Sequence, residues 1–120
     1  DFAFAAVNEP ATLVWNEIET TARPVRVILI GRQGPRTPIG ATVSWNLGAT
    51  PQHRQLAGGG SYESASDLAI DVTRLTEAEP VALEVTWPQG PSRQVTIPAG
   101  AREVLIREGV ADPVTRVAGL

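Results

Sequence analysis

Short stretches in which apolar and polar residues alternate one for one recur along this chain of 120 residues. The clearest cover residues 41–47, 81–87 and 93–97, and in the second of these Leu83 and Val85 share one face. Successive side chains of a β-strand point to opposite sides of the sheet. The alternation therefore predicts antiparallel strands, each with one buried and one solvated face.

Glycine and proline separate these stretches, with 11 Gly and 10 Pro in the chain. Proline cannot donate a ladder hydrogen bond, so Pro51 and Pro80 are expected to lie outside central strands. Many short strands divided by turns form the all-β pattern, and the length fits one domain. We therefore predict an all-β antiparallel sandwich of about seven to nine short strands, with a partly closed barrel as the alternative.

The apolar faces of the predicted strands define an expected core. Its members are Val27, Leu29, Val43, Trp45, Leu83, Val85, Trp87, Val95, Ile97 and Val104. Residues 25–30 are apolar almost throughout, interrupted only by Arg26. A continuous run of this kind indicates a strand that is covered on both faces.

One segment, residues 67–75, fits two patterns. Ile70 and Val72 have the period of a strand, whereas Leu68, Val72 and Leu75 have the spacing of one helix face. Because the surrounding segments are predicted strands, we favour a strand through Val72. A short helical turn is expected to follow over residues 76–79.

The patterns divide the chain into four parts. Residues 1–17 contain two short apolar runs around a turn at residues 8–10 and are expected to form a hairpin. A polar connector covers residues 18–24, and the β-domain covers residues 25–110. Residues 111–120 have neither periodicity nor turn residues and are expected to be loosely ordered. The chain does not begin with Met, which suggests a piece of a longer protein.

Composition excludes several classes of function. All ten basic residues are arginines, scattered along a chain with 13 acidic residues and a net charge of −3, so nucleic acid is not an expected partner. The absence of Cys excludes disulfides, thiolate metal sites and a cysteine nucleophile. No apolar stretch approaches the ~20 residues that a membrane-spanning helix needs, so membrane insertion is not expected.

A glycine-rich bend is the first candidate site. Ser61 follows three consecutive glycines, but neither the nucleophile elbow nor the phosphate-binding loop has this pattern, and the phosphate loop needs a lysine that the chain lacks. The simpler interpretation is a tight bend in which glycines take positive φ. Tyr62 stands beside it as an aromatic side chain free to meet a ligand. We therefore name Gly59, Gly60, Ser61 and Tyr62 as candidate ligand-binding residues.

Titratable residues offer weaker candidates. His53 is the only histidine, and a lone histidine in a chain without cysteine cannot form a usual zinc site, so an exposed position at a strand edge is expected. Glu63, Asp67 and Asp71 are spaced by four residues, which on a strand places successive carboxylates about 13 Å apart. That separation is too large for one metal ion or one glycosidic bond, so a solvated edge is the favoured interpretation.

Aromatic residues could form a platform for stacking sugars. The candidates are Trp15, Trp45, Tyr62 and Trp87. Trp45 and Trp87 lie in phase with apolar neighbours, so they are expected in the core instead. Tyr62 remains the best candidate for an exposed aromatic contact.

Four ordered segments resemble the ASPIC/UnbV domain family over roughly residues 25–109. They are Ile39-Gly40-Ala41-Thr42-Val43, Gln55–Gly60 with Ser61-Tyr62, Leu83-Glu84-Val85-Thr86-Trp87-Pro88-Gln89-Gly90, and Ile97-Pro98-Ala99-Gly100 with Val104-Leu105-Ile106-Arg107-Glu108-Gly109. Residues 36–40 match only in part the glycine-rich Arg-x-Gly-Ile-Gly segment that the family often has. Residues 71–80 depart from the family's usual sequence for this segment, which contains glycine.

The resemblance implies a domain on the C-terminal side of FG-GAP/VCBS-type β-propeller repeats, similar to the domain of cartilage acidic protein. It implies a secreted or cell-envelope protein in which residues 1–17 form the end of the last propeller blade. The propeller of the same parent chain is then a partner. The family has no established catalytic residues, and we expect no cofactor and no bound metal.

Three functions are consistent with these observations. The favoured one is a non-catalytic accessory or interaction module that meets protein or glycan partners. The second is a carbohydrate-binding module that uses the loop Gly58–Tyr62. The third is an enzyme that uses His53 and a nearby carboxylate. It is the least supported of the three, in part because a resemblance in fold does not by itself assign a chemical activity. The oligomeric state does not follow from the sequence.

Overall fold

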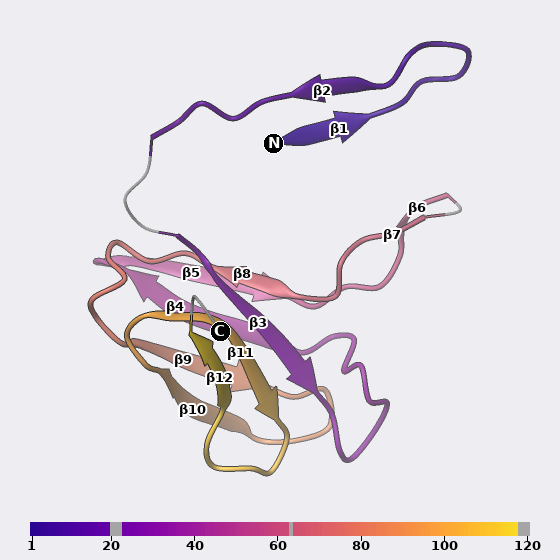
Figure 1. Ribbon diagram of the computed structural model, residues 1–120. Coiled ribbons are helices and arrows are strands. Elements are labelled where there is room, and N and C mark those ends of the chain that lie inside the picture. Colours follow the sequence, from indigo (N-terminus) through magenta and orange to yellow (C-terminus); the bar gives the residue numbers. More distant parts are fainter. Residues whose placement is uncertain (20–22, 63, 118–120) are drawn as a thin grey trace.

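The computed structural model describes residues 1–19, 23–62 and 64–117 (Figure 1). Within these ranges every regular element is a strand. The described residues therefore contain no helix that is long and apolar enough to cross a membrane. The strands are β1 (Phe2–Phe4), β2 (Thr12–Val14), β3 (Val25–Ile30), β4 (Thr42–Leu47), β5 (Thr50–Gln55), β6 (Gly60–Ser61), β7 (Ser64–Ala65), β8 (Ile70–Val72), β9 (Val81–Thr86), β10 (Ser92–Ile97), β11 (Ala101–Arg107) and β12 (Val114–Val117).

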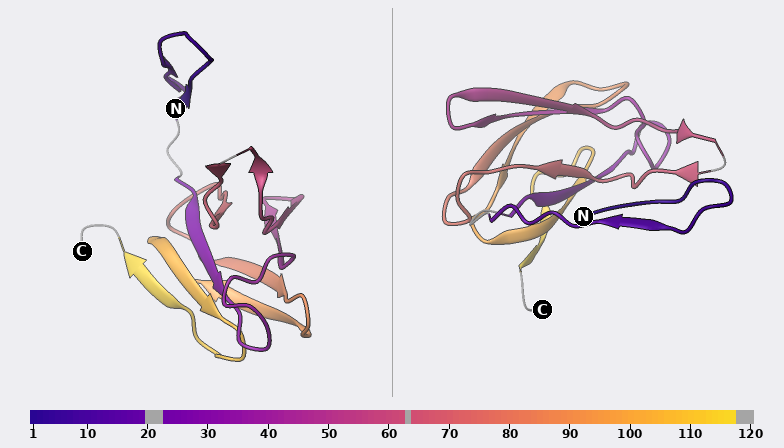
Figure 2. Two further views of the ribbon diagram at one scale, coloured as in Figure 1. Left: turned by 90° about the vertical axis from the view of Figure 1, so that its right-hand side faces the viewer. Right: turned by 90° about the horizontal axis from the view of Figure 1, so that it is seen from above.

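Two four-stranded sheets form the body of the domain (Figures 1 and 2). Sheet I has the order β10-β9-β4-β5, and sheet II has the order β12-β11-β3-β8. Neither sheet closes into a barrel, so the predicted sandwich is confirmed over its barrel alternative. Neighbouring strands are antiparallel with one exception, because β3 and β11 run parallel with Val27 beside Val104.

The core lies between the two sheets. All of the predicted core residues are buried, so that prediction is confirmed. The core also contains residues that the prediction did not include, namely Val25, Ala41, Leu56, Ile70, Val72, Ala101 and Ile106. Full burial of one Val or Leu side chain is worth about 1.5–3 kcal/mol, and this burial holds the sheets together without disulfides.

The prediction that β3 is covered on both faces is wrong. Val27 and Leu29 are buried, whereas Arg26 is exposed and Ile28 is only half-buried. The outward face of β3 meets no second layer from the described residues, and Leu105 of the parallel strand β11 lies beside Ile28 in register. Neighbouring side chains on the same face, rather than a covering layer, shield the outward isoleucines.

The ambiguous segment contains a short strand. β8 pairs with β3, and both Ile70 and Val72 point into the core. The strand interpretation is therefore correct, but the helical turn expected over residues 76–79 does not form. Leu68 and Leu75 are 40% and 67% exposed, so the residues with helical spacing share no buried face.

The prediction of a loosely ordered tail is wrong for residues 114–117. These residues form β12, which pairs antiparallel with β11 and places Val114 opposite Leu105. Pairing with β12 satisfies backbone groups of β11 that an open sheet edge would leave unpaired. Residues 118–120 lie outside the described residues.

The first residues form the expected hairpin, separate from both sheets. β1 pairs antiparallel with β2, with Phe2 opposite Val14. Asn8, in the turn between them, has a φ of 63°, a left-handed conformation that asparagine tolerates better than most residues. Part of the expected connector, residues 20–22, lies outside the described residues.

A buried arginine ties the segment after β8 to two other parts of sheet II. Arg74 is 7% exposed, and its Nε and Nη2 donate to the carbonyls of Arg23 and Ala101 at 3.1 and 3.0 Å. Beside it, the Glu77 carboxylate accepts from the Arg23 amide and forms an ion pair with Arg102. These bonds hold residues 74–77 against the entry to β3 and the start of β11.

We predict that Arg74→Ala destabilises the domain by about 2–4 kcal/mol, because two carbonyls lose their donor and a buried side chain loses its packing. Chemical denaturation followed by tryptophan fluorescence measures the change. The control is Arg107→Ala, which removes an exposed arginine and should shift stability by no more than about 0.5 kcal/mol. Equal stability of the two variants would contradict the role given to Arg74.

Candidate functional site

The glycine-rich bend forms a small projecting hairpin from β6 and β7 (Figure 1). Gly59 and Gly60 have φ values of 80° and 114°, so the interpretation as a bend that needs glycine is confirmed. Tyr62 at its tip is 88% exposed. The predicted site residue Ser61 lies in β6, and Glu63 lies outside the described residues.

The tryptophans do not build a stacking platform on the sandwich. Trp45 and Trp87 are 4% and 5% exposed, which confirms their place in the core. The Trp45 indole N–H donates to the carbonyl of Thr73 at 2.9 Å and so links sheet I to the segment after β8. Trp15 is exposed, but it follows β2 in the N-terminal hairpin.

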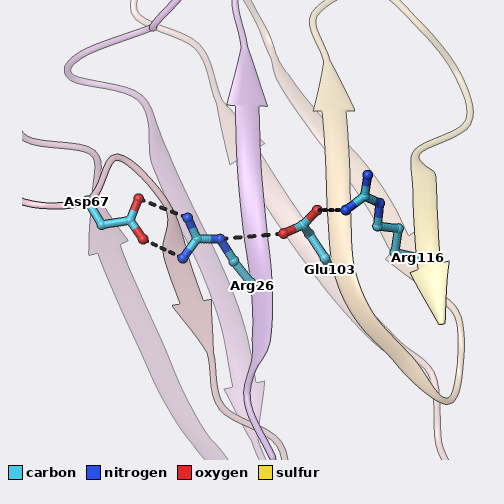
Figure 3. Close-up of polar contacts among 4 residues, drawn as sticks. All are labelled: Arg26, Asp67, Glu103 and Arg116. Carbon is cyan, nitrogen blue, oxygen red and sulfur yellow. Dashed lines mark hydrogen bonds and ion pairs between the residues drawn. The ribbon is translucent and has the colours of Figure 1, made fainter. Parts of the chain in front are cut away.

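Of the spaced carboxylates, Asp67 belongs to a solvated ion-pair row on sheet II (Figure 3). Asp67 pairs with Arg26, whose Nε lies 3.5 Å from Glu103, and Glu103 lies 3.7 Å from Arg116. The hydrogen bond to Asp67 is the main cause that raises the pKa of the Arg26 guanidinium. Asp71 lies opposite Arg26 in register.

The row in Figure 3 has a structural role rather than the geometry of a metal site. The described residues contain no group of three or more His, Asp or Glu side chains arranged to hold a metal ion. Opposite charges alternate across the strands of sheet II, which is a favourable arrangement for cross-strand neighbours. The solvated edge predicted for Asp67 and Asp71 is confirmed, since both are exposed on or beside the edge strand β8.

A second row of polar side chains crosses the outer face of sheet I. Gln94 of β10 lies opposite Glu84 of β9, and its Nε2 donates to Glu84 Oε2 at 3.4 Å. Glu84 lies opposite Ser44 of β4. Ser44 in turn lies opposite His53 of β5, with 3.1 Å between Ser44 Oγ and His53 Nδ1. The exposed edge position predicted for His53 is confirmed. The four residues of the row also border a hollow of about 570 Å³.

Three members of this row, Ser44, Glu84 and Gln94, were not among the residues predicted from the sequence to form a site. Each occupies a solvated position of an alternating stretch, which is the only signal the sequence carries for it. Their meeting depends on the register of strands that are far apart in the chain. Periodicity alone does not reveal that register.

The order of the row differs from that of a hydrolase triad. In a triad the carboxylate orients the histidine, which contacts the serine. Here Glu84 lies on the opposite side of Ser44 from His53. Ser44 also sits on a strand paired on both sides, so its surrounding amides serve the sheet rather than an oxyanion hole. The Ser44–His53 pair therefore lacks the geometry of a hydrolase triad.

Comparison with known proteins gives one match. The family model described as ASPIC and UnbV matches residues 31–113, which include β4 to β11. The chain belongs to the ASPIC and UnbV family. A search of curated proteins and a search of solved structures each found no match. The family-model match confirms the ASPIC/UnbV resemblance that was inferred from four sequence segments.

Segments that carry the ASPIC/UnbV resemblance meet at Glu108. Its Oε2 accepts from the backbone amides of Arg32 and Gln33 at 2.6 and 2.9 Å. A Cβ atom at Gly90 would lie 3.1 Å from Glu108 Oε1, so a larger residue in the loop after Trp87 would crowd the Glu108 carboxylate. In this ASPIC/UnbV domain the Trp-Pro-Gln-Gly and Arg-Glu-Gly segments thus lie against each other.

Glu108→Gln is expected to lower stability at neutral pH and to weaken its dependence on acid. The two amide hydrogen bonds hold the pKa of the Glu108 carboxyl below its ordinary value of 4.5. Their contribution is therefore present above about pH 4.5 and is lost as the pH falls through the lower pKa of the folded state.

Thermal melts at pH 7 and at pH 3 check this expectation. The Tm gap between the wild type and Glu108→Gln should be wide at pH 7 and narrow at pH 3. Glu79→Gln, which changes an exposed glutamate, is the control and should show little gap at either pH. A Glu108→Gln gap of the same size at both values would refute the charge-assisted role of Glu108.

Proposed function

We propose that this ASPIC/UnbV domain is a non-catalytic interaction module of a secreted or cell-envelope protein. It is joined to a β-propeller of the same parent chain through its N-terminal hairpin, and it presents the sandwich to protein or glycan partners. The observation that carries the proposal is the apolar surface of that hairpin.

The hairpin exposes apolar side chains on both of its faces. Phe2 and Phe4 are 64% and 48% exposed, with ring centroids 5.8 Å apart, and on the other strand Leu13 and Val14 are 61% and 52% exposed. Trp15 beside them is 68% exposed. An isolated two-stranded hairpin is marginally stable at best, and apolar side chains gathered this way mark an interaction surface.

A propeller blade is the cover that we infer for this hairpin. The family resemblance supplies the expectation of a preceding propeller, and a blade is itself an antiparallel sheet to which a two-stranded hairpin can add. The sandwich itself does not provide the cover, because Phe2, Leu13 and Trp15 stay 64%, 61% and 68% exposed beside it.

A non-catalytic role is supported by the chemistry of the two polar rows. The carboxylate Asp67 is paired with Arg26 in one row, and the Ser44–His53 pair lacks the oriented carboxylate of a triad in the other. Surface ion pairs and cross-strand hydrogen bonds of this kind stabilise a sheet face rather than a transition state.

Hydrogen exchange tests the hairpin proposal. In the parent protein with its preceding propeller, the amides of β1 and β2 should exchange at least ten-fold more slowly than in the 120-residue chain, because the hairpin is then covered. The amides of the edge strand β5 serve as the internal control and should exchange alike in both proteins. Equal exchange of β1 and β2 in the two proteins would overturn the proposal.

Carbohydrate binding by the Gly58–Tyr62 loop is the second candidate. The specific observation in its favour is Tyr62, which is 88% exposed at the tip of a projecting hairpin. An exposed ring on a glycine-bounded bend can stack on the apolar face of a sugar.

Tyr62→Ala tests this second candidate on a glycan array. The variant should lose array binding at least ten-fold while keeping the Tm of the wild type, since the ring contributes nothing to the core. Unchanged binding in Tyr62→Ala would exclude the loop as the contact site.

A further inference from the structure

The outer face of sheet I carries a shallow hollow of about 570 Å³ that is open to solvent. The polar row Ser44, His53, Glu84 and Gln94 contributes to its lining, and Asn46 and Gln52 border it. Four neighbouring strands span roughly 14 Å, so the row offers a line of polar contacts long enough for a short oligomer.

The chemistry of the lining narrows the class of ligand. Among the described residues that line it, Glu84 is the only carboxylate and none is an arginine, which disfavours anions such as phosphates and nucleic acids. Besides Glu84, the polar side chains of the lining are three amides, one hydroxyl and one imidazole, which both donate and accept hydrogen bonds. Protein interfaces usually centre on aromatic anchors, whereas the tryptophan in this lining, Trp45, is 4% exposed.

We propose that this hollow is a binding site for a neutral oligosaccharide. Glu84 accepts from two neighbouring hydroxyls of one sugar through its two oxygens, which gives the strongest contact because the acceptor is charged. Gln94 and Asn46 add donors and acceptors on either side. Pro51 and Ala82 offer small apolar surfaces to the C–H face of the ligand.

The Ser44–His53 pair fixes one end of the site. Ser44 is half-buried in the sheet, and its hydroxyl holds the exposed imidazole of His53 at 3.1 Å. The ring therefore stands over the edge strand β5 in one orientation, and its other nitrogen, Nε2, is left to meet a ligand hydroxyl. The row thus combines a charged acceptor at Glu84 with an oriented ring at His53.

This site differs from both surfaces in the proposed function. It lies on sheet I, whereas the apolar hairpin and the Tyr62 bend lie outside that sheet. The inference shares with the proposed function only the premise that the domain binds ligands. Failure of the hairpin proposal would appear in hydrogen exchange of β1 and β2 and would leave this site untouched.

The test measures binding of neutral oligosaccharides to the 120-residue chain on a glycan array, followed by calorimetric titration of the ligands it retains. Glu84→Ala should weaken their binding by roughly 10-fold or more, the loss expected when a charged hydrogen-bond acceptor is removed. Glu84→Gln should retain part of the affinity. The matched control Glu79→Gln, which changes an exposed glutamate outside the hollow, should bind as the wild type does.

Three results would overturn the site. They are an array that retains no neutral oligosaccharide, a Glu84→Ala variant with wild-type affinity, and binding that is lost in Tyr62→Ala but kept in Glu84→Ala. The last result would transfer the binding to the bend and so separate the two candidate sites. Glu84 is exposed, so each variant should keep the Tm of the wild type and a loss of folding does not confuse the outcome.

Discussion

The burial of one apolar face per strand is the constraint on which the rest of this molecule depends. No disulfide joins the two sheets, so the aliphatic side chains between them carry the stability. Alternation along each strand then decides where every other residue points. The ion-pair row on sheet II and the polar row on sheet I exist because the inward positions of the same strands are apolar.

The periodicity of the sequence predicted which strand residues are buried in the core. Residues such as Leu83 and Val85 could be assigned to the core because no other strand orientation hides them. The periodicity did not predict the features that depend on pairing with a strand far away in the sequence. β12 forms because β11 offers it an edge, and the meeting of Glu84 with Ser44 follows from the register between β9 and β4. Neither partner is visible in a local window of sequence.

Buried polar side chains form hydrogen bonds to the backbone at the margins of this aliphatic core. Glu108 uses one carboxylate oxygen to hold two amides of the loop after β3. Arg74 holds two carbonyls near the other end of that strand, and the Trp45 indole holds a third beside it. Each of the three meets backbone rather than another side chain, so each fixes the path of a connection that no sheet ladder could hold.

The parallel pairing of β3 with β11 has a consequence for how the chain reaches its fold. β3 ends at Ile30, and its partner begins at Ala101, so the contact closes a loop of most of the domain. Contacts this distant in sequence raise the contact order and slow folding. During synthesis from the N-terminus, β3 must wait for nearly the whole domain before its main neighbour exists. Until then its only sheet II neighbour is the three-residue strand β8, so the nascent domain exposes its most apolar strand for the longest time.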